Sequence, residues 1–133
     1  MDHYVLIWSV CMYVESRVQG EVSLGDIAVH TGFSLPHVRE VFRNQTGKPL
    51  VRYVQERQMA HAAQMLLHTD ASVLDVALQY GYASRDVFSR TFRRLTGYTP
   101  TAFRAARLPL ARVKLCAGVY GPALPKKREE QSK

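Results

Sequence analysis

The chain has 133 residues, of which 47% are hydrophobic and 22% are charged. This composition excludes an intrinsically disordered chain and suffices for one sizeable core, or for two small cores that share an element. The net charge of +7 favours a polyanionic partner, either nucleic acid or an acidic membrane surface. The charge is uneven, because residues 1–33 contain four acidic residues and one arginine, whereas residues 71–107 contain six arginines and two aspartates. A docking face in the second region is therefore expected.

The first predicted element is a helix over residues 3–19, whose apolar residues recur at helical spacing. Its inward stripe consists of Ile7, Val10, Cys11, Val14 and Val18. Further apolar side chains lie off this stripe: Tyr4, Trp8, Met12 and Tyr13. They belong either to a wide core contact or to an exposed surface for a protein partner, for which Trp8 and Met12 are the candidates.

The apolar run at residues 4–14 has the length of a signal-peptide core but not its flanks. Asp2 precedes the run, Glu15 and Arg17 follow it, and no small-residue cleavage site is present. The run is also too short to span a bilayer. The two cysteines, Cys11 and Cys116, lie far apart and indicate a reducing compartment. We therefore expect a cytoplasmic protein with no membrane contact.

An internal repeat organises the rest of the chain. The segment "SLGDIAVHTGF" at 23–33 matches "SVLDVALQYGY" at 72–82 with an offset of 49. The segment "NQTGKPLVRYV" at 44–54 matches "RLTGYTPTAFR" at 94–104 with an offset of 50, so one residue has been inserted between the two matches. The chain therefore carries two copies of one supersecondary unit.

Each copy is predicted to form a helix, a tight turn and a second helix. Serines precede all four helices as N-caps, and Gly32 and Gly81 end the first helix of each copy. The predicted N-caps are Ser23, Ser34, Ser72 and Ser84. The predicted inward residues are Leu24, Ile27, Ala28, Val38, Val41 and Phe42 in the first copy, and Val73, Val76, Ala77, Val87, Thr91 and Phe92 in the second, with Phe88 beside them. This pattern is typical of a helix-turn-helix, whose second helix meets DNA.

A longer helix over residues 49–68 joins the copies, and a last helix begins after Thr99 with Pro100 in its first turn and Phe103 as its anchor. The predicted buried residues of the joining helix are Val51, Val54, Ala62, Met65 and Leu66. The predicted fold is all-α, with seven helices in two helix-turn-helix lobes. We assign the first lobe to 3–47, the second to 72–107, the whole DNA-binding domain to 1–107, and a partly disordered tail to 108–133.

The repeat, the Arg57 and Ala62 spacing before the Leu66-Leu67 pair, and the stretch "DVALQYGYASRDVFSRTFRRLTGYTPTAFR" resemble the AraC/XylS-type family of bacterial transcription regulators. The resemblance covers residues 5 to about 107 and is strongest to small members. It implies recognition helices at about 35–45 and 85–95 in successive major grooves of double-stranded DNA. It also implies an activator that recruits RNA polymerase at promoters of stress or drug-resistance genes.

The length of the joining helix agrees with binding in successive major grooves, independently of the family resemblance. A joining helix of 20 residues is about 30 Å long, and one turn of DNA is about 34 Å. A monomer could therefore bind an asymmetric site of roughly 20 base pairs.

The outward faces of the second helices supply the candidate site residues. An arginine can bridge guanine O6 and N7, whereas its alternatives are a phosphate contact or a solvated charge. The candidates for base contact are Arg39, Arg85, Ser89 and Arg90. The candidates for phosphate contact are Arg43, Lys48, Arg52, Arg93, Arg94 and Arg104.

The sequence predicts neither an enzyme nor a cofactor. It has no paired carboxylates in a plausible cleft, no nucleophile–His–acid order and no phosphate-binding loop. His61 and His68 are two helical turns apart, which does not suit a metal site. Two alternatives to a sequence-specific regulator stay open: a protein-only adaptor or anti-regulator, and a helical module that binds nucleic acid non-specifically.

Overall fold

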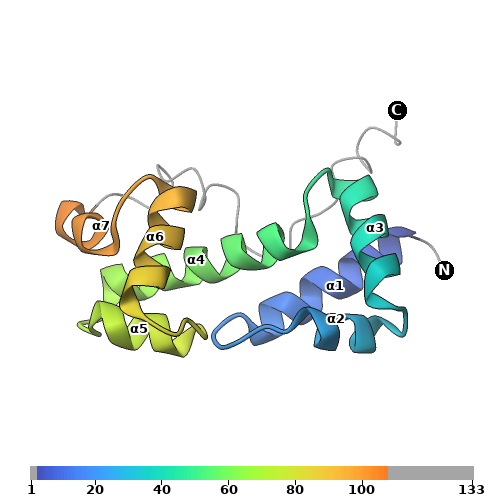
Figure 1. The fold of residues 1–133 in the computed structure, drawn as a ribbon, viewed down its shortest axis with the longest axis horizontal. Coiled ribbons are helices and arrows are strands. Elements are labelled where there is room, and N and C mark those ends of the chain that lie inside the picture. Colours follow the sequence, from blue (N-terminus) through green and yellow to red (C-terminus); the bar gives the residue numbers. More distant parts are fainter. Residues whose placement is uncertain (1–2, 108–133) are drawn as a thin grey trace. The chain divides into compact units, whose positions relative to one another are not determined.

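A computed structural model describes residues 3–107 of the protein, and within this range it is entirely helical (Figure 1). The elements are α1 (His3–Arg17), α2 (Leu24–Thr31), α3 (Leu35–Thr46), α4 (Leu50–His68), α5 (Val73–Gln79), α6 (Arg85–Thr96) and α7 (Pro100–Ala106). The predicted all-α class with seven helices is confirmed over these residues. The tail at 108–133, with Cys116, lies outside the described residues.

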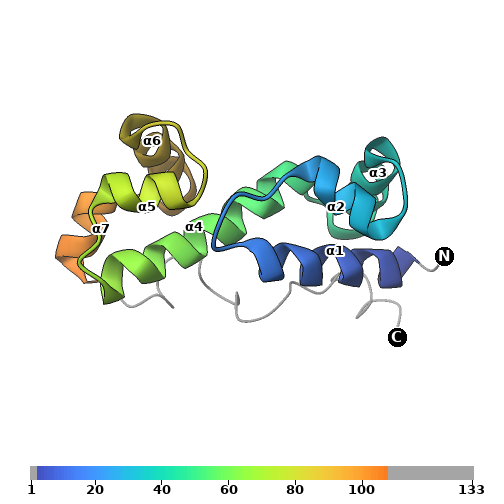
Figure 2. The same cartoon turned by 90° about the horizontal axis from the view of Figure 1, so that it is seen from below.

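The described chain divides into two compact units, with the boundary inside α4. The first unit contains α1, residues 22–49 with α2 and α3, and α4 up to Gln55. Among the described residues, the second contains the short segment Val18–Glu21 and the chain from Glu56 to residue 107. Figures 1 and 2 show which helices belong together in each unit.

The first unit is a three-helix bundle closed by the start of α4. Each of α1, α2 and α3 contacts the other two. Buried side chains from all of these helices form one core: Leu6, Ile7, Val10, Cys11, Val14, Ile27, Ala28, Val38, Val41, Phe42, Leu50, Tyr53 and Val54. Phe42 of α3 lies 5.2 Å from Tyr53 of α4, measured between ring centroids, so the second helix of this copy is fixed to α4.

The core of the second unit is built around aromatic rings. Phe92 of α6 lies 5.8 Å from Phe88 and 5.5 Å from Phe103 of α7, between ring centroids. All three rings are fully buried and pack with Met59, Ala62, Ala63 and Leu66 of α4 and with Val76 and Ala77 of α5. Because aromatic side chains bury large apolar areas, these rings hold the inward side of α6 in the core.

The caps explain where the short helices begin. Each predicted N-cap hydroxyl accepts a hydrogen bond from the backbone amide three residues later, at 3.0–3.3 Å for the serines and 3.1 Å for Thr99. These hydroxyls satisfy amides that have no partner within the helix. The five predicted caps at Ser23, Ser34, Ser72, Ser84 and Thr99 are therefore confirmed.

The repeated Thr-Gly pair ends the second helix of each copy in the same way. Thr46 donates its hydroxyl to the carbonyl of Phe42 at 2.7 Å and accepts from the amide of Lys48 at 3.2 Å. Thr96 makes the equivalent bonds with Phe92 at 2.7 Å and Tyr98 at 3.1 Å. The duplication thus preserves hydrogen bonds as well as sequence.

Three details of the prediction are wrong: the end of one helix and the burial of two valines. Helix α1 ends at Arg17 rather than at residue 19. Val51 is 49% exposed, because Leu50, Tyr53 and Val54 already form the inward side of that turn. Val87 is 39% exposed, because the residue inserted in the second copy places Phe88 at the inward position instead.

Candidate nucleic-acid interface

Helix α6 has one buried side and one strongly basic side. Phe88, Phe92, Leu95 and Thr96 are buried. Arg90, Arg93 and Arg94 are exposed with Arg85 and Asp86, whereas Ser89 is half-buried. Because residues three and four apart lie on the same side of a helix, Arg90, Arg93 and Arg94 form a continuous basic surface. The structure therefore presents most of the predicted DNA-contacting residues of the second copy on one helix.

Helix α3 has the same division with less positive charge. Val38, Val41 and Phe42 are buried. Arg39, Glu40 and Arg43 are exposed, as is His37 at the start of the helix. The His37 ring lies 5.1 Å from the ring of Phe33, so its position is partly fixed by the turn. The exposed arginines Arg39 and Arg43 are the ones that the sequence predicts to contact DNA.

The remaining predicted phosphate contacts lie outside the two second helices. Lys48 is half-buried just before α4, and Arg52 is exposed in the first turn of α4. Arg104 is half-buried on α7, and its guanidinium donates to the backbone carbonyls of Leu66, Thr69 and Ala71 at 2.8, 3.3 and 2.6 Å. Arg104 therefore has protein partners that the sequence pattern did not indicate.

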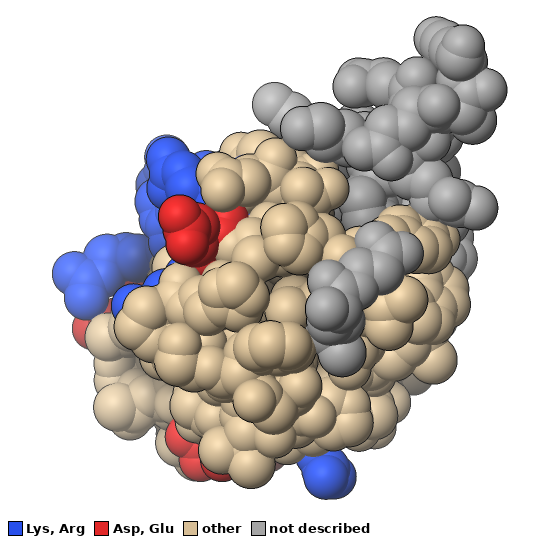
Figure 3. All heavy atoms as spheres, turned by 90° about the vertical axis from the view of Figure 1, so that its right-hand side faces the viewer, with Lys and Arg blue, Asp and Glu red and all other residues tan. Residues whose placement is uncertain are grey.

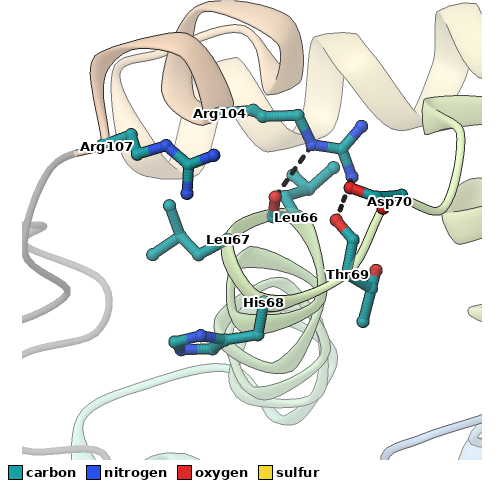
Figure 4. Close-up of a pocket in the computed structure, with 7 residues that line it drawn as sticks. All are labelled: Leu66, Leu67, His68, Thr69, Asp70, Arg104 and Arg107. Carbon is teal, nitrogen blue, oxygen red and sulfur yellow. Dashed lines mark hydrogen bonds between the residues drawn. The ribbon is translucent and has the colours of Figure 1, made fainter.

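Figure 4 shows Arg104 at the edge of a hollow beside the end of α4. The hollow has a volume of about 320 Å³ and is lined by Leu66, Leu67, His68, Thr69, Asp70, Arg104 and Arg107. The dashed bonds in the figure run from Arg104 to the carbonyls of Leu66 and Thr69. The polar groups that line this hollow thus come largely from the α4–α5 junction and from Arg104, which is bonded to it.

Two residues of the interface were missed or incompletely described by the sequence pattern. Val87 is an exposed apolar side chain in the first turn of α6, three residues before Arg90. The offset of 50 between the Thr-Gly pairs aligns Phe88, rather than Val87, with the buried Val38, and this alignment could have shown that Val87 lies outside the core. Arg85 donates from Nη2 to the Thr101 hydroxyl of α7 at 3.4 Å, which links the start of α6 to the next helix.

Helix α1 presents a separate exposed surface. Val5, Trp8 and Met12 are 49%, 39% and 47% exposed and lie at positions i, i+3 and i+7, so they share one face. We call these three residues the α1 apolar stripe. Figure 3 faces the right-hand side of Figure 1, where most of the visible described surface is uncharged and the charged side chains lie toward its left and lower parts.

Two tyrosines near α6, Tyr80 and Tyr82, have raised pKa values. Burial raises the pKa of Tyr80 to about 12. Burial also raises the pKa of Tyr82, although the nearby Arg94 charge lowers it in part. Both phenols therefore stay protonated, and the charge of this region comes from its arginines and aspartates.

Within residues 3–107 no cluster of three or more histidine, cysteine or acidic side chains could hold a metal ion. None of the helices described combines the length and the hydropathy needed to cross a membrane.

Comparison with known proteins identifies the family. A family model described as a helix-turn-helix domain matches residues 27–106. The HTH-type transcriptional activator AarP of Providencia stuartii is 33% identical over 99 residues, which are 74% of this chain and 73% of AarP. The right origin-binding protein of Escherichia coli K12 is 30% identical over 104 residues, which are 78% of this chain but 36% of that protein.

Solved structures agree with this assignment. A transcriptional regulator from Chromobacterium violaceum with an AraC-type DNA-binding domain superposes with a TM-score of 0.72 at 27% identity, covering 77% of this chain and 92% of that one. The DNA-binding domain of AdpA, solved in complex with a target DNA, superposes with a TM-score of 0.68 at 25% identity, covering 75% and 90%. AarP is named a transcriptional activator and the Chromobacterium violaceum protein a transcriptional regulator, in agreement with the sequence, which predicts no enzyme. The chain belongs to the AraC-type family of helix-turn-helix proteins and is a sequence-specific DNA-binding transcription regulator.

Proposed function

We propose that the protein binds one asymmetric double-stranded DNA site of roughly 20 base pairs as a monomer, with α3 and α6 in successive major grooves. One observation carries the proposal: a single chain contains two capped helix-turn-helix units, and each presents a second helix with exposed arginines. Dimeric proteins of this class need two chains to present two such helices. The 19 residues of α4 span about 28 Å, similar to the length of one DNA turn.

Base recognition is assigned to the outward faces of α3 and α6. Arg90 lies opposite the buried Phe88 and Phe92, so it is the first candidate for a bidentate contact with guanine. Arg39, Arg85 and Ser89 are the further candidates. The exposed Val87 adds an apolar group one turn before Arg90, suited to the methyl group of thymine.

Phosphate contacts are assigned to the arginines and the lysine that flank these faces. They are Arg43, Lys48, Arg52, Arg93 and Arg94. Contacts of this kind release counterions and so make the affinity depend steeply on salt, but they carry no sequence preference. Arg104 was predicted to belong to this group, and its role is considered separately below.

The regulatory role is assigned to activation. AarP, which shares 33% identity with the chain, is named a transcriptional activator. The α1 apolar stripe supports contact with a second protein, because exposed contiguous apolar groups mark protein-binding surfaces. We assign this surface to RNA polymerase, recruited in the bacterial cytoplasm at promoters of stress or drug-resistance genes.

Binding experiments with the purified protein test this function. Sites are selected from random duplexes, and the selected site is then mapped by footprinting and titrated against a scrambled duplex and single-stranded RNA. We expect protection of about two helical turns by one molecule, and a preference for the selected site of at least about a thousandfold over scrambled DNA.

The rival functions give different results in the same titrations. A non-specific module would bind all three nucleic acids with similar affinity and similar salt dependence. A protein-only adaptor would give no footprint. A footprint of a single helical turn, or a stoichiometry of two chains per site, would contradict the proposed mode of binding.

A further inference from the structure

The end of α4 is stabilised by groups from outside the helix. The last four carbonyls of a helix have no partner within it. Thr69 supplies two donors, because its amide and its hydroxyl both bond to the carbonyl of Met65, at 3.0 and 2.7 Å. The next carbonyl, that of Leu66, accepts from Nε of Arg104 at 2.8 Å. A side chain of α7 therefore caps α4.

The same guanidinium also holds the segment that follows. Its Nη2 donates to the carbonyls of Thr69 at 3.3 Å and Ala71 at 2.6 Å. Arg104 thus contacts both sides of the α4–α5 junction, and Figure 4 shows its bonds to Leu66 and Thr69. Ser72, the N-cap of α5, comes directly after this junction. The first helix of the second helix-turn-helix therefore begins from a segment that Arg104 fixes in place.

Helix α7 is also attached to the recognition helix. Phe103, next to Arg104, packs against Phe92 of α6 with ring centroids 5.5 Å apart. Thr101 accepts a hydrogen bond from Arg85 at the start of α6. One short helix therefore connects the α4–α5 junction to α6, and Arg104 supplies its polar attachment.

We propose that Arg104 is a positioning residue for DNA recognition by α6, which acts by fixing the α4–α5 junction rather than by contact with phosphate. The inference rests on the proposed function. Three of the five guanidinium N–H groups already bond to backbone carbonyls. A phosphate that took these donors would break the bonds to the carbonyls of Leu66, Thr69 and Ala71. Lysine cannot replace the arginine, because its single ammonium lacks the planar fork that reaches all three carbonyls.

The test compares charge-keeping and charge-removing variants at two positions. The variants are Arg104→Lys, Arg104→Gln, Arg93→Lys and Arg93→Gln, each measured at a temperature at which circular dichroism shows it to be fully folded. Affinity for the selected site is measured over a range of salt concentrations. The amides around residues 72–77 are followed by hydrogen exchange without DNA.

We expect both Arg104 variants to bind about tenfold more weakly, the effect of losing a hydrogen bond from a charged group. Their salt slope should match that of the wild type, and the loss of base discrimination should be confined to the half-site that α6 reads. The amides of α5 should exchange faster in both variants. Arg93→Gln should instead reduce the salt slope by about 0.9, and Arg93→Lys should keep it.

Several results would overturn the inference. Wild-type affinity in Arg104→Lys, together with a reduced slope in Arg104→Gln, would make Arg104 a phosphate contact. Normal affinity of both folded variants, with only a lower melting temperature, would make its role purely structural. If the wild-type protein showed no sequence preference, both the proposed function and the positioning role of Arg104 would be wrong. If the wild-type protein showed a preference and Arg104→Lys retained it in full, only the positioning role would be wrong.

Discussion

The turn between α5 and α6 gives a direct test of packing in the second helix-turn-helix. Gly81 has a φ of +84°, a left-handed conformation that costs a residue with a Cβ about 1–2 kcal/mol. A Cβ at this position would also overlap Cγ of Glu21 and lie 3.0 Å from its Cδ. Glu21 is exposed and can move, which we expect to cost about 0.5–1.5 kcal/mol through a less favourable rotamer. Gly81→Ala should therefore lower the free energy of unfolding by about 1.5–3.5 kcal/mol.

Gly32 provides the matched control, because it occupies the equivalent turn of the first copy. Its φ is +82°, and a Cβ there would meet nothing within 4 Å. Gly32→Ala should cost only the backbone strain, about 1–2 kcal/mol. Adding Glu21→Ala to Gly81→Ala should recover the difference between the two glycine variants. The measurement is urea denaturation followed by circular dichroism, with the slope of the transition checked for each variant.

Two results would refute this reasoning. The first is an equal loss of stability in Gly81→Ala and Gly32→Ala, which would show that the Glu21 contact costs nothing. The second is a loss in Gly81→Ala that persists when Glu21 is shortened, because the steric contribution would then come from elsewhere.

Three further predictions concern DNA binding and activation. Arg90→Ala should lose about 1–3 kcal/mol on the selected site and relax the preference at one base pair, measured by competition with single-base variants; an equal loss on every sequence would make Arg90 a phosphate contact. Val87→Ala should lose about 1 kcal/mol of preference for thymine at one position without loss of stability, and an unchanged preference would exclude the methyl contact. Trp8→Ala should leave the footprint intact and lower transcription from a target promoter in a purified system, whereas unchanged transcription would remove the α1 apolar stripe from the activation mechanism.

The sequence predicted the helix starts well because their signals are local. An N-cap is recognised from one side chain and the amide three residues later, so the five caps could be identified without any tertiary contact. The fold class followed from the same signals, since each capped helix in the first copy has a counterpart in the second.

Burial was predicted less well where it depends on register. Aligned with the offset of 49 that fits the first helices, Val87 takes the place of buried Val38. With the offset of 50 that fits the Thr-Gly pairs, Phe88 takes that place, and Phe88 is the residue that is buried. The inserted residue lies in the turn, so it leaves both helices intact and changes only which side chain faces the core.

Arg104 was difficult to assign because its partners are backbone carbonyls more than 30 positions away in the sequence. Every residue has a backbone carbonyl, so the sequence does not show which carbonyls accept a hydrogen bond from an arginine. No motif therefore distinguishes an arginine that caps a helix from one that is available to bind a phosphate. The distinction changes a measurable quantity. Six phosphate contacts predict a slope of log affinity against log salt of about −5.4, whereas five predict about −4.5. The proposed positioning role of Arg104 therefore lowers the expected salt slope by about 0.9 relative to the sequence-based prediction.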